Sequence, residues 1–348
     1  MSPRHPASSS VWLRCAFLAL FVMLILPAQA RAEFHLLHTA VLGGDGGWDY
    51  ITFDSIGHRL FITRSMHVMV VDSDSLKLIG DIPNTPGVHG VALVQDLGRG
   101  FTSNGRDTSV TMFDLKTLQP LARIRVGMQP DAITYDPASK RVFVMNGGSG
   151  SASAIDPKAG AVVGTVMLGG QPEEPACDGK GRMYVNLEDS SRVVMVDTRT
   201  LKVVGGWPLA PGEEPTGIAF DRAHDRLFSG CANNKLVVSD VQKGSVVATL
   251  PIGARVDGVG YDAAKGLAFS SNGEGTLTVV HEESPAKFSV VGTVTTALGA
   301  RTCTFDPSSR RIFLITAQFG PLPDSSATQP RPRRPMLPGS FQLLVLGE

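Results

Sequence analysis

Seven polar side chains recur at intervals of 40 to 44 residues along a chain of 348 residues, only 18% of which are charged. They are Asp49, His89, Asp131, Glu173, Thr216, Asp257 and Arg301. Equivalent positions of a sequence repeat meet in space when the repeated units surround a common axis. The spacing therefore predicts that these seven residues, called the axial ring below, form one ligand-binding site.

The residue types of the axial ring indicate which chemistry is available. Carboxylates with one imidazole can coordinate a divalent cation, and the candidate ligands are Asp49, His89, Asp131 and Glu173. Inner strands of neighbouring units lie several ångströms apart, so all four can reach one ion only through water or inward-bending loops. Arg301 can pair with Asp257 or grip an anionic ligand through its planar fork of donors.

Signatures of catalysis are missing from the sequence. His89 beside a carboxylate has the composition of an oriented general base, but no nucleophile accompanies it. The segment Gly147–Ser151 resembles a nucleophile elbow and fails at its final position. The chain also has no Cys-x-x-Cys and no His-Glu-x-x-His motif. The sequence thus favours a binding protein over an enzyme.

Two rows of anchor residues, which end short β-type runs, define the units that carry the ring. The first row is Asp54, Val94, Asp136, Asp178, Asp221, Asp262 and Asp306, and each member follows its ring residue by five positions. The second row is Asp72, Asp114, Asp156, Asp197, Asp240 and His281. About four strands per unit and a period of roughly 40–45 residues predict an all-β, seven-bladed β-propeller.

The seventh unit is one strand short at the C-terminal end. The segment Phe34–Leu42 with its following Gly43-Gly44 resembles the fourth strand of another unit, Val162–Leu168 with Gly169-Gly170. We therefore expect the N-terminal strand to complete the last blade and close the ring, which removes exposed sheet edges.

Propeller geometry places the axial ring on one face, here called the top. The connections into the innermost strands and those between second and third strands share this face, so the ring should surround the mouth of the central channel. Loops on a rigid scaffold are where such folds bind small molecules or proteins. The alternative is a polar lining of a water-filled channel.

Other polar residues are expected to be structural. The anchor aspartates should accept hydrogen bonds from backbone N–H groups in the turns of the opposite face, where His58 and His224 should be solvated. Asn104, Asn146, Asn186 and Asn272 lie in second-to-third connections. We expect these asparagines to fold their turns by bonding local backbone.

An insertion at 317–340 holds six prolines and the basic residues Arg331, Arg333 and Arg334. Proline excludes regular strand and helix and favours extended segments. The insertion leaves the top face, so it can cover the channel mouth and set its arginines against the acidic ring, or remain a solvated loop.

The first 30 residues have the pattern of a secretory signal peptide, with Arg4 and Arg14, the apolar run Ala16–Leu26 and the small-x-small site at Ala28–Ala30. We expect export to the periplasm or secretion, with residues 31–348 forming one propeller domain. No later segment is apolar over the length of a membrane span. A formal net charge of zero argues against nucleic acid as a partner, and the protein is expected to be a monomer.

The second strands carry a resemblance to a known family. The segments Phe101–Asn104, Phe143–Asn146 and Phe269–Asn272 resemble the aromatic-x-x-Asn signature of YVTN-type β-propeller repeats, whose exported bacterial members are called YncE-like. Blades 1, 5 and 7 depart from it, with Arg64, Cys231 and Thr316 in place of the asparagine.

The resemblance implies the fold and export but no specific activity. Relatives carry a cysteine near position 212 that can pair with Cys231, whereas this chain has Gly212, so no disulfide is expected there. We expect Cys177 and Cys303 to fill the core. The alternatives to a binding or scaffold protein are a metal-assisted, lactonase-like hydrolase and an accessory of a periplasmic quinone-dependent redox pathway.

Overall fold

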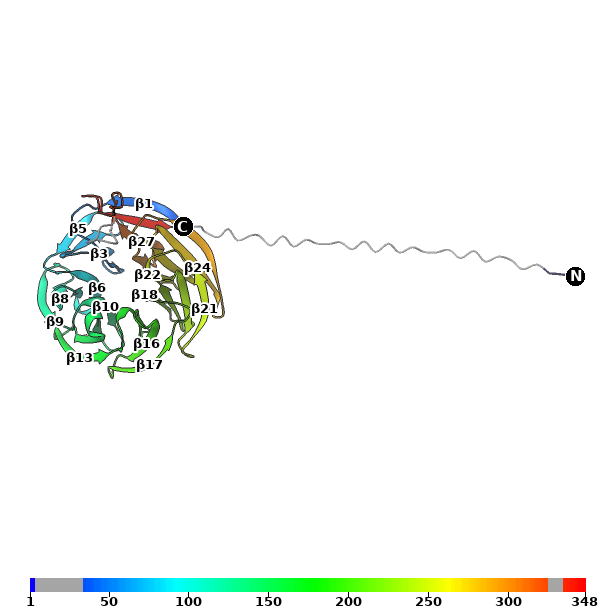
Figure 1. The fold of residues 1–348 in the computed structure, drawn as a ribbon, viewed down its shortest axis with the longest axis horizontal. Helices are drawn as coiled ribbons and strands as arrows, with labels where there is room; N and C mark the ends of the chain where they lie inside the picture. Colours follow the sequence, from blue (N-terminus) through cyan, green and yellow to red (C-terminus); the bar gives the residue numbers. More distant parts are fainter. Residues whose placement is uncertain (4–33, 325–333) are drawn as a thin grey trace. The chain divides into compact units, whose positions relative to one another are not determined.

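Seven four-stranded antiparallel sheets surround a central axis, as Figure 1 shows, and this confirms the predicted seven-bladed β-propeller. The computed structural model describes residues 1–3, 34–324 and 334–348. Residues Glu33–Glu348 form one compact unit. The proposed signal peptide falls on residues outside the described part, apart from the first three. Among the described residues, no helix has the length and apolarity needed to cross a membrane.

In blades 1 to 6 the strands follow the chain from the axis outward. Blade 1 contains β2 (Ile51–Asp54), β3 (Arg59–Arg64), β4 (His67–Asp72) and β5 (Leu78–Ile82). Blade 2 contains β6 (Val88–Val94), β7 (Arg99–Asn104), β8 (Ser109–Asp114) and β9 (Pro120–Arg125). Blade 3 contains β10 (Pro130–Asp136), β11 (Arg141–Asn146), β12 (Ser151–Asp156) and β13 (Ala161–Met167). Blade 4 contains β14 (Pro172–Cys177), β15 (Arg182–Leu187), β16 (Arg192–Asp197) and β17 (Lys202–Pro208).

The remaining blades continue this order. Blade 5 contains β18 (Pro215–Asp221), β19 (Arg226–Cys231), β20 (Lys235–Asp240) and β21 (Ser245–Pro251). Blade 6 contains β22 (Val256–Asp262), β23 (Leu267–Asn272), β24 (Thr276–Ser284) and β25 (Lys287–Thr295). Blade 7 contains β26 (Cys303–Asp306), β27 (Arg311–Thr316), β28 (Gln342–Gly347) and β1 (His35–Val41). Two short 3-10 turns, η1 (Gln95–Leu97) and η2 (Gly147–Ser149), join second strands to their neighbours.

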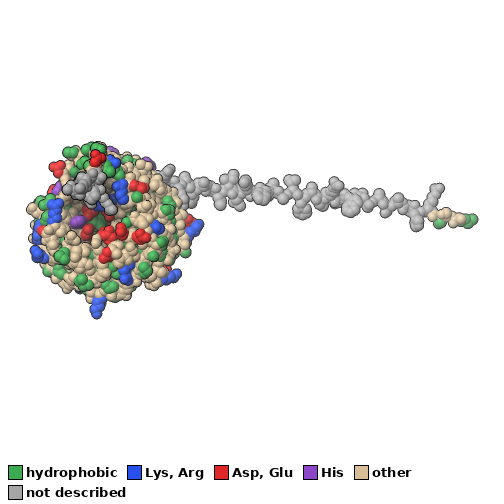
Figure 2. All heavy atoms as spheres, in the orientation of Figure 1, with side chains coloured by type: hydrophobic (Ala, Val, Ile, Leu, Met, Phe, Trp, Pro, Cys, Tyr) green, Lys and Arg blue, Asp and Glu red, His purple; other side chains and the backbone are tan. Residues whose placement is uncertain are grey.

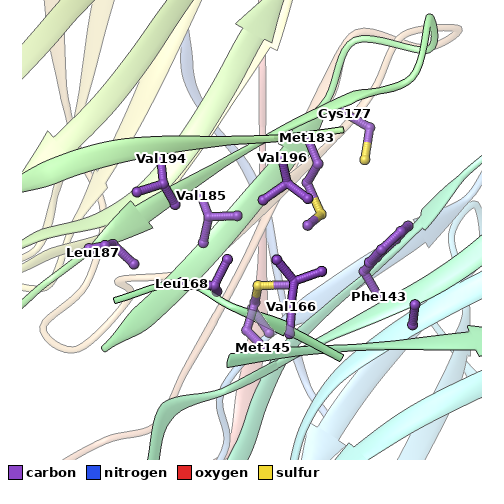
Figure 3. Packing of buried hydrophobic residues seen from close by; sticks show 13 residues of the cluster. Phe143, Met145, Val166, Leu168, Cys177, Met183, Val185, Leu187, Val194 and Val196 are labelled. Atoms are coloured by element: carbon purple, nitrogen blue, oxygen red, sulfur yellow. The ribbon is translucent and has the colours of Figure 1, made fainter. Parts of the chain in front are cut away.

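Burial explains the residue pattern of each strand position. The second strand β11 is buried at five of six positions because neighbouring blades cover both faces of its sheet, so its sequence is nearly continuously apolar. The outer strand β13 exposes most of its residues. The core therefore lies between blades. Figure 3 shows one such layer, in which Phe143 and Met145 of blade 3 pack with Met183 and Val185 of blade 4.

Closure of the ring depends on both ends of the propeller, as predicted. Strand β1 pairs antiparallel with β28, from His35 opposite Gly347 to Val41 opposite Gln342. In Figure 1 the blue β1 lies beside the red C-terminal strand. The Leu42 N–H then donates to the Phe341 carbonyl at 2.8 Å.

Arg64 fixes the chain where it passes from blade 7 into blade 1. This side chain is fully buried and donates to the carbonyls of Gly43, Gly44, Asp45 and Gly46 at 2.9 to 3.2 Å. Its guanidinium also stacks on the ring of Phe341 at 3.7 Å. Burial lowers the pKa of Arg64 to about 10, a value at which the group remains charged at neutral pH.

The anchor aspartates behave as predicted. Asp54 Oδ1 accepts hydrogen bonds from the N–H groups of Ile56 and Gly57 at 3.0 and 2.9 Å. Asp114 repeats the pattern with Lys116 and Thr117, and these donors lower its pKa. The carboxylates thus close the turns of the bottom face.

The expectation for the asparagines was wrong. The amide of Asn104 is buried and donates to the hydroxyls of Ser109 and Thr111 on the third strand, not to local backbone. Asn146 and Asn272 bond hydroxyls of their own third strands in the same way. Neighbouring blades bury the end of the second strand, so the asparagine amide needs hydrogen-bond partners within the sheet. Asn186 instead donates to backbone carbonyls of blade 5.

The three cysteines in the described part of the chain are free thiols. Cys177 is buried as expected, whereas Cys303, also expected to fill the core, is only partly covered. Cys231 is buried as well. A Cβ atom placed on Gly212 would lie 2.6 Å from Cys231 Sγ. Cys231 thus lies beside position 212, and it remains a free thiol because that position is a glycine.

Arg64→Gln should lower the free energy of unfolding by on the order of 3 kcal/mol, because carbonyls at the blade 7 to blade 1 passage lose their shared donor. Chemical denaturation followed by circular dichroism measures this change. Arg125→Gln, an exposed arginine at the end of β9, is the matched control and should change stability little. Equal stability of the two variants would contradict the role assigned to Arg64.

Candidate functional site

The axial ring surrounds a single cavity. All seven residues line a top-face cavity of about 1090 Å³. Figure 2 shows acidic side chains and a histidine gathered around a hollow on this face. The convergence predicted from the repeat spacing is therefore present. Whether a ligand occupies the cavity stays a prediction.

Local backbone geometry turns the ring side chains toward the axis. His89, Asp131, Glu173, Thr216 and Asp257 are each the second residue of an innermost strand. In all five strands the pairing register shifts within the first four residues. Such irregularities redirect side chains and end regular pairing. They explain why polar residues can stand at the start of otherwise buried strands.

Asp49 and Arg301 stand in the loops just before β2 and β26. Hydrogen bonds to their backbone carbonyls hold these loops to the neighbouring blades. The Thr302 hydroxyl donates to the Asp49 carbonyl at 2.7 Å, and the Gly258 N–H donates to the Arg301 carbonyl at 2.8 Å. The ring is thus built on fixed elements and not on long mobile loops.

Five members of the ring form a continuous line of opposite charges. His89 Nδ1 lies 2.6 Å from Asp49 Oδ2 and 3.6 Å from Asp131 Oδ1. Arg301 contacts Asp49 Oδ1 at 3.4 Å and Asp257 Oδ2 at 3.0 Å. The pairing of Asp257 with Arg301 was expected, and Asp49 joins this pair to the histidine.

Thr216 and Glu173 stand apart from this line. The Thr216 hydroxyl donates to the Val256 carbonyl at 3.2 Å, which gives it a structural role. Glu173 lines the cavity without joining an ion pair among the described residues. Beside it, Glu188 accepts a hydrogen bond from Gln171 Nε2 at 2.7 Å. Among the described residues, Glu173 and Glu188 of blade 4 therefore have no cationic partner.

Burial and mutual repulsion change the acidity of these groups. Burial, with repulsion from Asp131, raises the pKa of Glu173 to about 9. Burial also raises the pKa values of Asp131 and Asp257, although Arg301 acts against the rise. Burial alone would lower the pKa of His89, but its hydrogen bond to Asp49 and the charge of Asp131 outweigh it and raise the pKa.

One further carboxyl lies deeper in the channel. Glu174 lines a smaller space of about 110 Å³ below the ring together with Tyr50. Its Oε2 accepts the Ile218 N–H at 3.0 Å, and burial raises its pKa to about 8. Glu214, the other acid near the ring in sequence, is exposed and does not line the cavity.

Three of the four candidate metal ligands converge. One ligand atom from each of Asp49, His89 and Asp131 lies within 4.8 Å of the others. Glu173 is not part of this group, because β14 starts one blade farther around the ring. The site can therefore offer one imidazole nitrogen and two carboxylate oxygens to a cation, with Glu173 available only at longer range.

Part of the wall of the top-face cavity comes from the insertion at 317–340, whose individual wall residues were not predicted. The insertion folds back on itself, with Phe319 paired to Met336, and it contributes Phe319, Leu322 and Arg334 to the cavity. Trp48 packs against Phe319 with ring centroids 6.1 Å apart. Arg331 and Arg333 lie outside the described residues. The position of the insertion on the top face was predictable, but its apolar contribution was not.

Arg255 also lines the cavity. It does not stand out in the sequence repeat, because its counterparts in the other blades are uncharged or acidic. Its guanidinium donates to the Gly273 carbonyl at 2.8 Å. Arg334 similarly donates to the Gly320 carbonyl at 3.2 Å. Both arginines are thus anchored to backbone carbonyls, and among the described residues neither forms an ion pair with Glu173 or Glu188 of blade 4.

Known proteins resemble this chain at a distance. No family model matches it. A curated relative, the dihydro-heme d1 dehydrogenase of Pseudomonas aeruginosa, is 24% identical over 264 residues, which cover 73% of this chain and 48% of the relative. The chain thus spans about half the length of that relative. The resemblance to YVTN-type repeats stays a prediction.

Solved structures support the fold. A chain of hydrazine synthase from Kuenenia stuttgartiensis superposes with a TM-score of 0.69 at 17% identity, covering 79% of this chain and 94% of that one. A chain of a mitotic checkpoint complex superposes with a TM-score of 0.73 at 13% identity, covering 97% and 99%. Similarity at these identities concerns architecture alone.

The raised pKa values predict that stability falls as pH rises. Between the ordinary glutamate pKa of 4.5 and the folded values of about 9 and 8, Glu173 and Glu174 keep protons that the unfolded chain releases. Their stabilising contribution is complete below the ordinary value and disappears as pH rises through the folded values. Melting temperatures measured across this interval should therefore decrease with pH.

Glu174→Gln should flatten this pH dependence, because glutamine keeps an acceptor for the Ile218 N–H without a titrating proton. Glu214→Gln, which removes an exposed acid outside the cavity, serves as the control and should keep the wild-type slope. A wild-type slope in Glu174→Gln would contradict the assignment.

Proposed function

We propose that this protein is a ligand-binding β-propeller whose ligand occupies the top-face cavity and is held there through a cation. The observation that carries this proposal is the convergence of seven equivalent residues on one cavity of about 1090 Å³ in a chain with few charges. Cavities of roughly 300–1,000 Å³ with a few convergent polar groups are typical ligand sites.

The charge distribution favours a positively charged occupant. Arg301 compensates Asp49 and Asp257, whereas Asp131 faces only the histidine at 3.6 Å. Glu173 and Glu188 add further carboxyl groups on the same side of the cavity, and a bound cation would favour the ionised form of Glu173, whose pKa is raised to about 9 by burial and by repulsion from Asp131. A divalent cation near Asp49, His89 and Asp131 would be attracted by this excess, and its open coordination positions would face the cavity.

A second candidate is an accessory role in a redox pathway, supported by the curated relative. Its name says that it dehydrogenates dihydro-heme d1, and the aligned region covers most of this propeller. The cavity wall offers the flat apolar surfaces of Trp48 and Phe319 with Leu322 beside them. Such a wall suits a planar macrocycle, whose carboxylates could pair with Arg255 or Arg334.

Titration with Mn²⁺ alone tests the cation site. We expect wild-type protein to bind Mn²⁺, detected by the loss of the free-ion electron paramagnetic resonance signal. Asp131→Asn should lose one equivalent of bound ion or weaken its binding by about tenfold or more, since a carboxylate ligand is removed. Glu214→Gln should bind as the wild type does. Unchanged Mn²⁺ binding in Asp131→Asn would refute this site.

Titration with haem tests the second candidate. If the cavity accepts a planar macrocycle, the absorption band of haem should shift on addition of the protein, and Phe319→Ala should weaken binding by roughly tenfold through lost stacking area. The exposed Leu121→Ala on β9 is the control. A spectrum identical to that of free haem would remove this candidate while leaving the cation site standing.

A further inference from the structure

A second cluster of ligating atoms lies at the bottom face, between blades 5 and 6. Asp221 ends the innermost strand β18, and His224 follows in the turn to β19. Glu282 comes from β24 of the next blade. One oxygen or nitrogen atom from each residue lies within 4.8 Å of the other two. His224, expected to be solvated, therefore has two acidic neighbours.

Glu282 is unusual for its position. The residue after the third-strand anchor is Ser73, Leu115, Pro157, Thr198 or Val241 in the other blades with a complete repeat. Here a carboxylate stands in that place with a side chain only 1% exposed. Its Oε2 accepts the Tyr261 hydroxyl at 2.8 Å. Its Oε1 has no hydrogen-bond partner among the described residues.

While both carboxylates are ionised, the single hydrogen on His224 Nδ1 cannot satisfy the two oxygens that face it. His224 Nδ1 lies 2.6 Å from Asp221 Oδ2 and 3.2 Å from Glu282 Oε1. A ring nitrogen carries one hydrogen at most, whether the imidazole is neutral or protonated. That hydrogen goes to Asp221, with which the hydrogen bond forms. Glu282 Oε1 is therefore a buried acceptor aimed at the cluster without a donor, which is costly in a protein interior.

We propose that Asp221, His224 and Glu282 bind a divalent transition-metal cation that joins blades 5 and 6 at the bottom face. A cation that replaces the hydrogen on His224 Nδ1 would give this nitrogen, Asp221 Oδ2 and Glu282 Oε1 a common partner. One imidazole and two carboxylates suit Zn²⁺, which commonly takes three protein ligands and water. At zinc–ligand distances of about 2.0–2.1 Å, tetrahedral ligands lie roughly 3.3 Å apart. The 3.2 Å between His224 Nδ1 and Glu282 Oε1 is close to this value, whereas the 2.6 Å between His224 Nδ1 and Asp221 Oδ2 would have to widen when the ion binds.

The surroundings also have the features of a metal site. The Tyr261 hydroxyl orients Glu282, and the Ala223 N–H donates to Asp221 Oδ1 at 3.0 Å, so both carboxylates are held by neighbouring groups. The His224 side chain is 45% exposed, which leaves a path for the ion and room for water. Because the ligands come from two blades, binding would stabilise their contact.

Isothermal titration with Zn²⁺ tests this proposal on the full chain. Wild-type protein should bind Zn²⁺ and show a higher melting temperature with Zn²⁺ than with a chelator. Glu282→Gln and His224→Gln should each weaken this binding by about tenfold or more. Glutamine at 282 keeps an acceptor for Tyr261, and melting temperatures in chelator verify that both variants fold.

Two controls separate this site from other binding. His67→Gln alters a histidine with one acidic partner, Asp81 at 2.5 Å, and should leave Zn²⁺ binding intact. Asp131→Asn alters the top-face cluster and should retain the Zn²⁺ bound between blades 5 and 6. The proposal would be overturned if wild-type protein did not bind Zn²⁺, or if Glu282→Gln and His224→Gln bound it as tightly as the wild type does. Either result would count whatever is found for the top face.

Discussion

The structure depends on the burial of each sheet between its two neighbours. A single blade has four short strands and two apolar faces, neither of which it can cover by itself. Only a closed ring supplies every blade with two partners. The pairing of β1 with β28 completes the seventh blade and thereby closes the ring that buries the other six. Arg64 secures it from the side of blade 1 by holding four successive carbonyls of the connecting segment.

Closure around an axis also explains the chemistry of the top face. The arrangement of the blades around one axis brings together residues at or just before the starts of the innermost strands. Asp49 and Arg301, for example, are in contact although more than 250 residues separate them in the sequence. Carboxylates that would be ordinary surface groups on an open sheet then face one another across a partly desolvated space. Burial, together with repulsion between neighbouring carboxylates, raises the pKa values of Asp131, Glu173 and Asp257, and a positively charged occupant would relieve this repulsion.

The sequence was sufficient for features governed by the repeat and insufficient for those governed by side-chain contacts. Period and anchors predicted the seven blades, the closing strand and the axial ring, because all blades obey the same backbone geometry. The asparagine contacts were mispredicted, since a turn preference gives no information on hydroxyls across a sheet. Glu282 and His224 were not recognised as neighbours, because they meet only across the interface of two blades. The apolar wall around Phe319 came from an insertion outside the repeat.

Blade 7 combines strands from both ends of the propeller, and this determines when the fold can be completed. Its outermost strand is the earliest propeller segment to leave the ribosome, and its adjacent strand is the last. Each of blades 1 to 6 is formed by one continuous stretch of sequence, so its strands can pair without the rest of the chain. Strand β1, in contrast, can pair only after β28 has been synthesised. Contacts of such long sequence separation slow folding. Until β28 is available, blade 7 cannot form, and the edge of β1 has no partner strand.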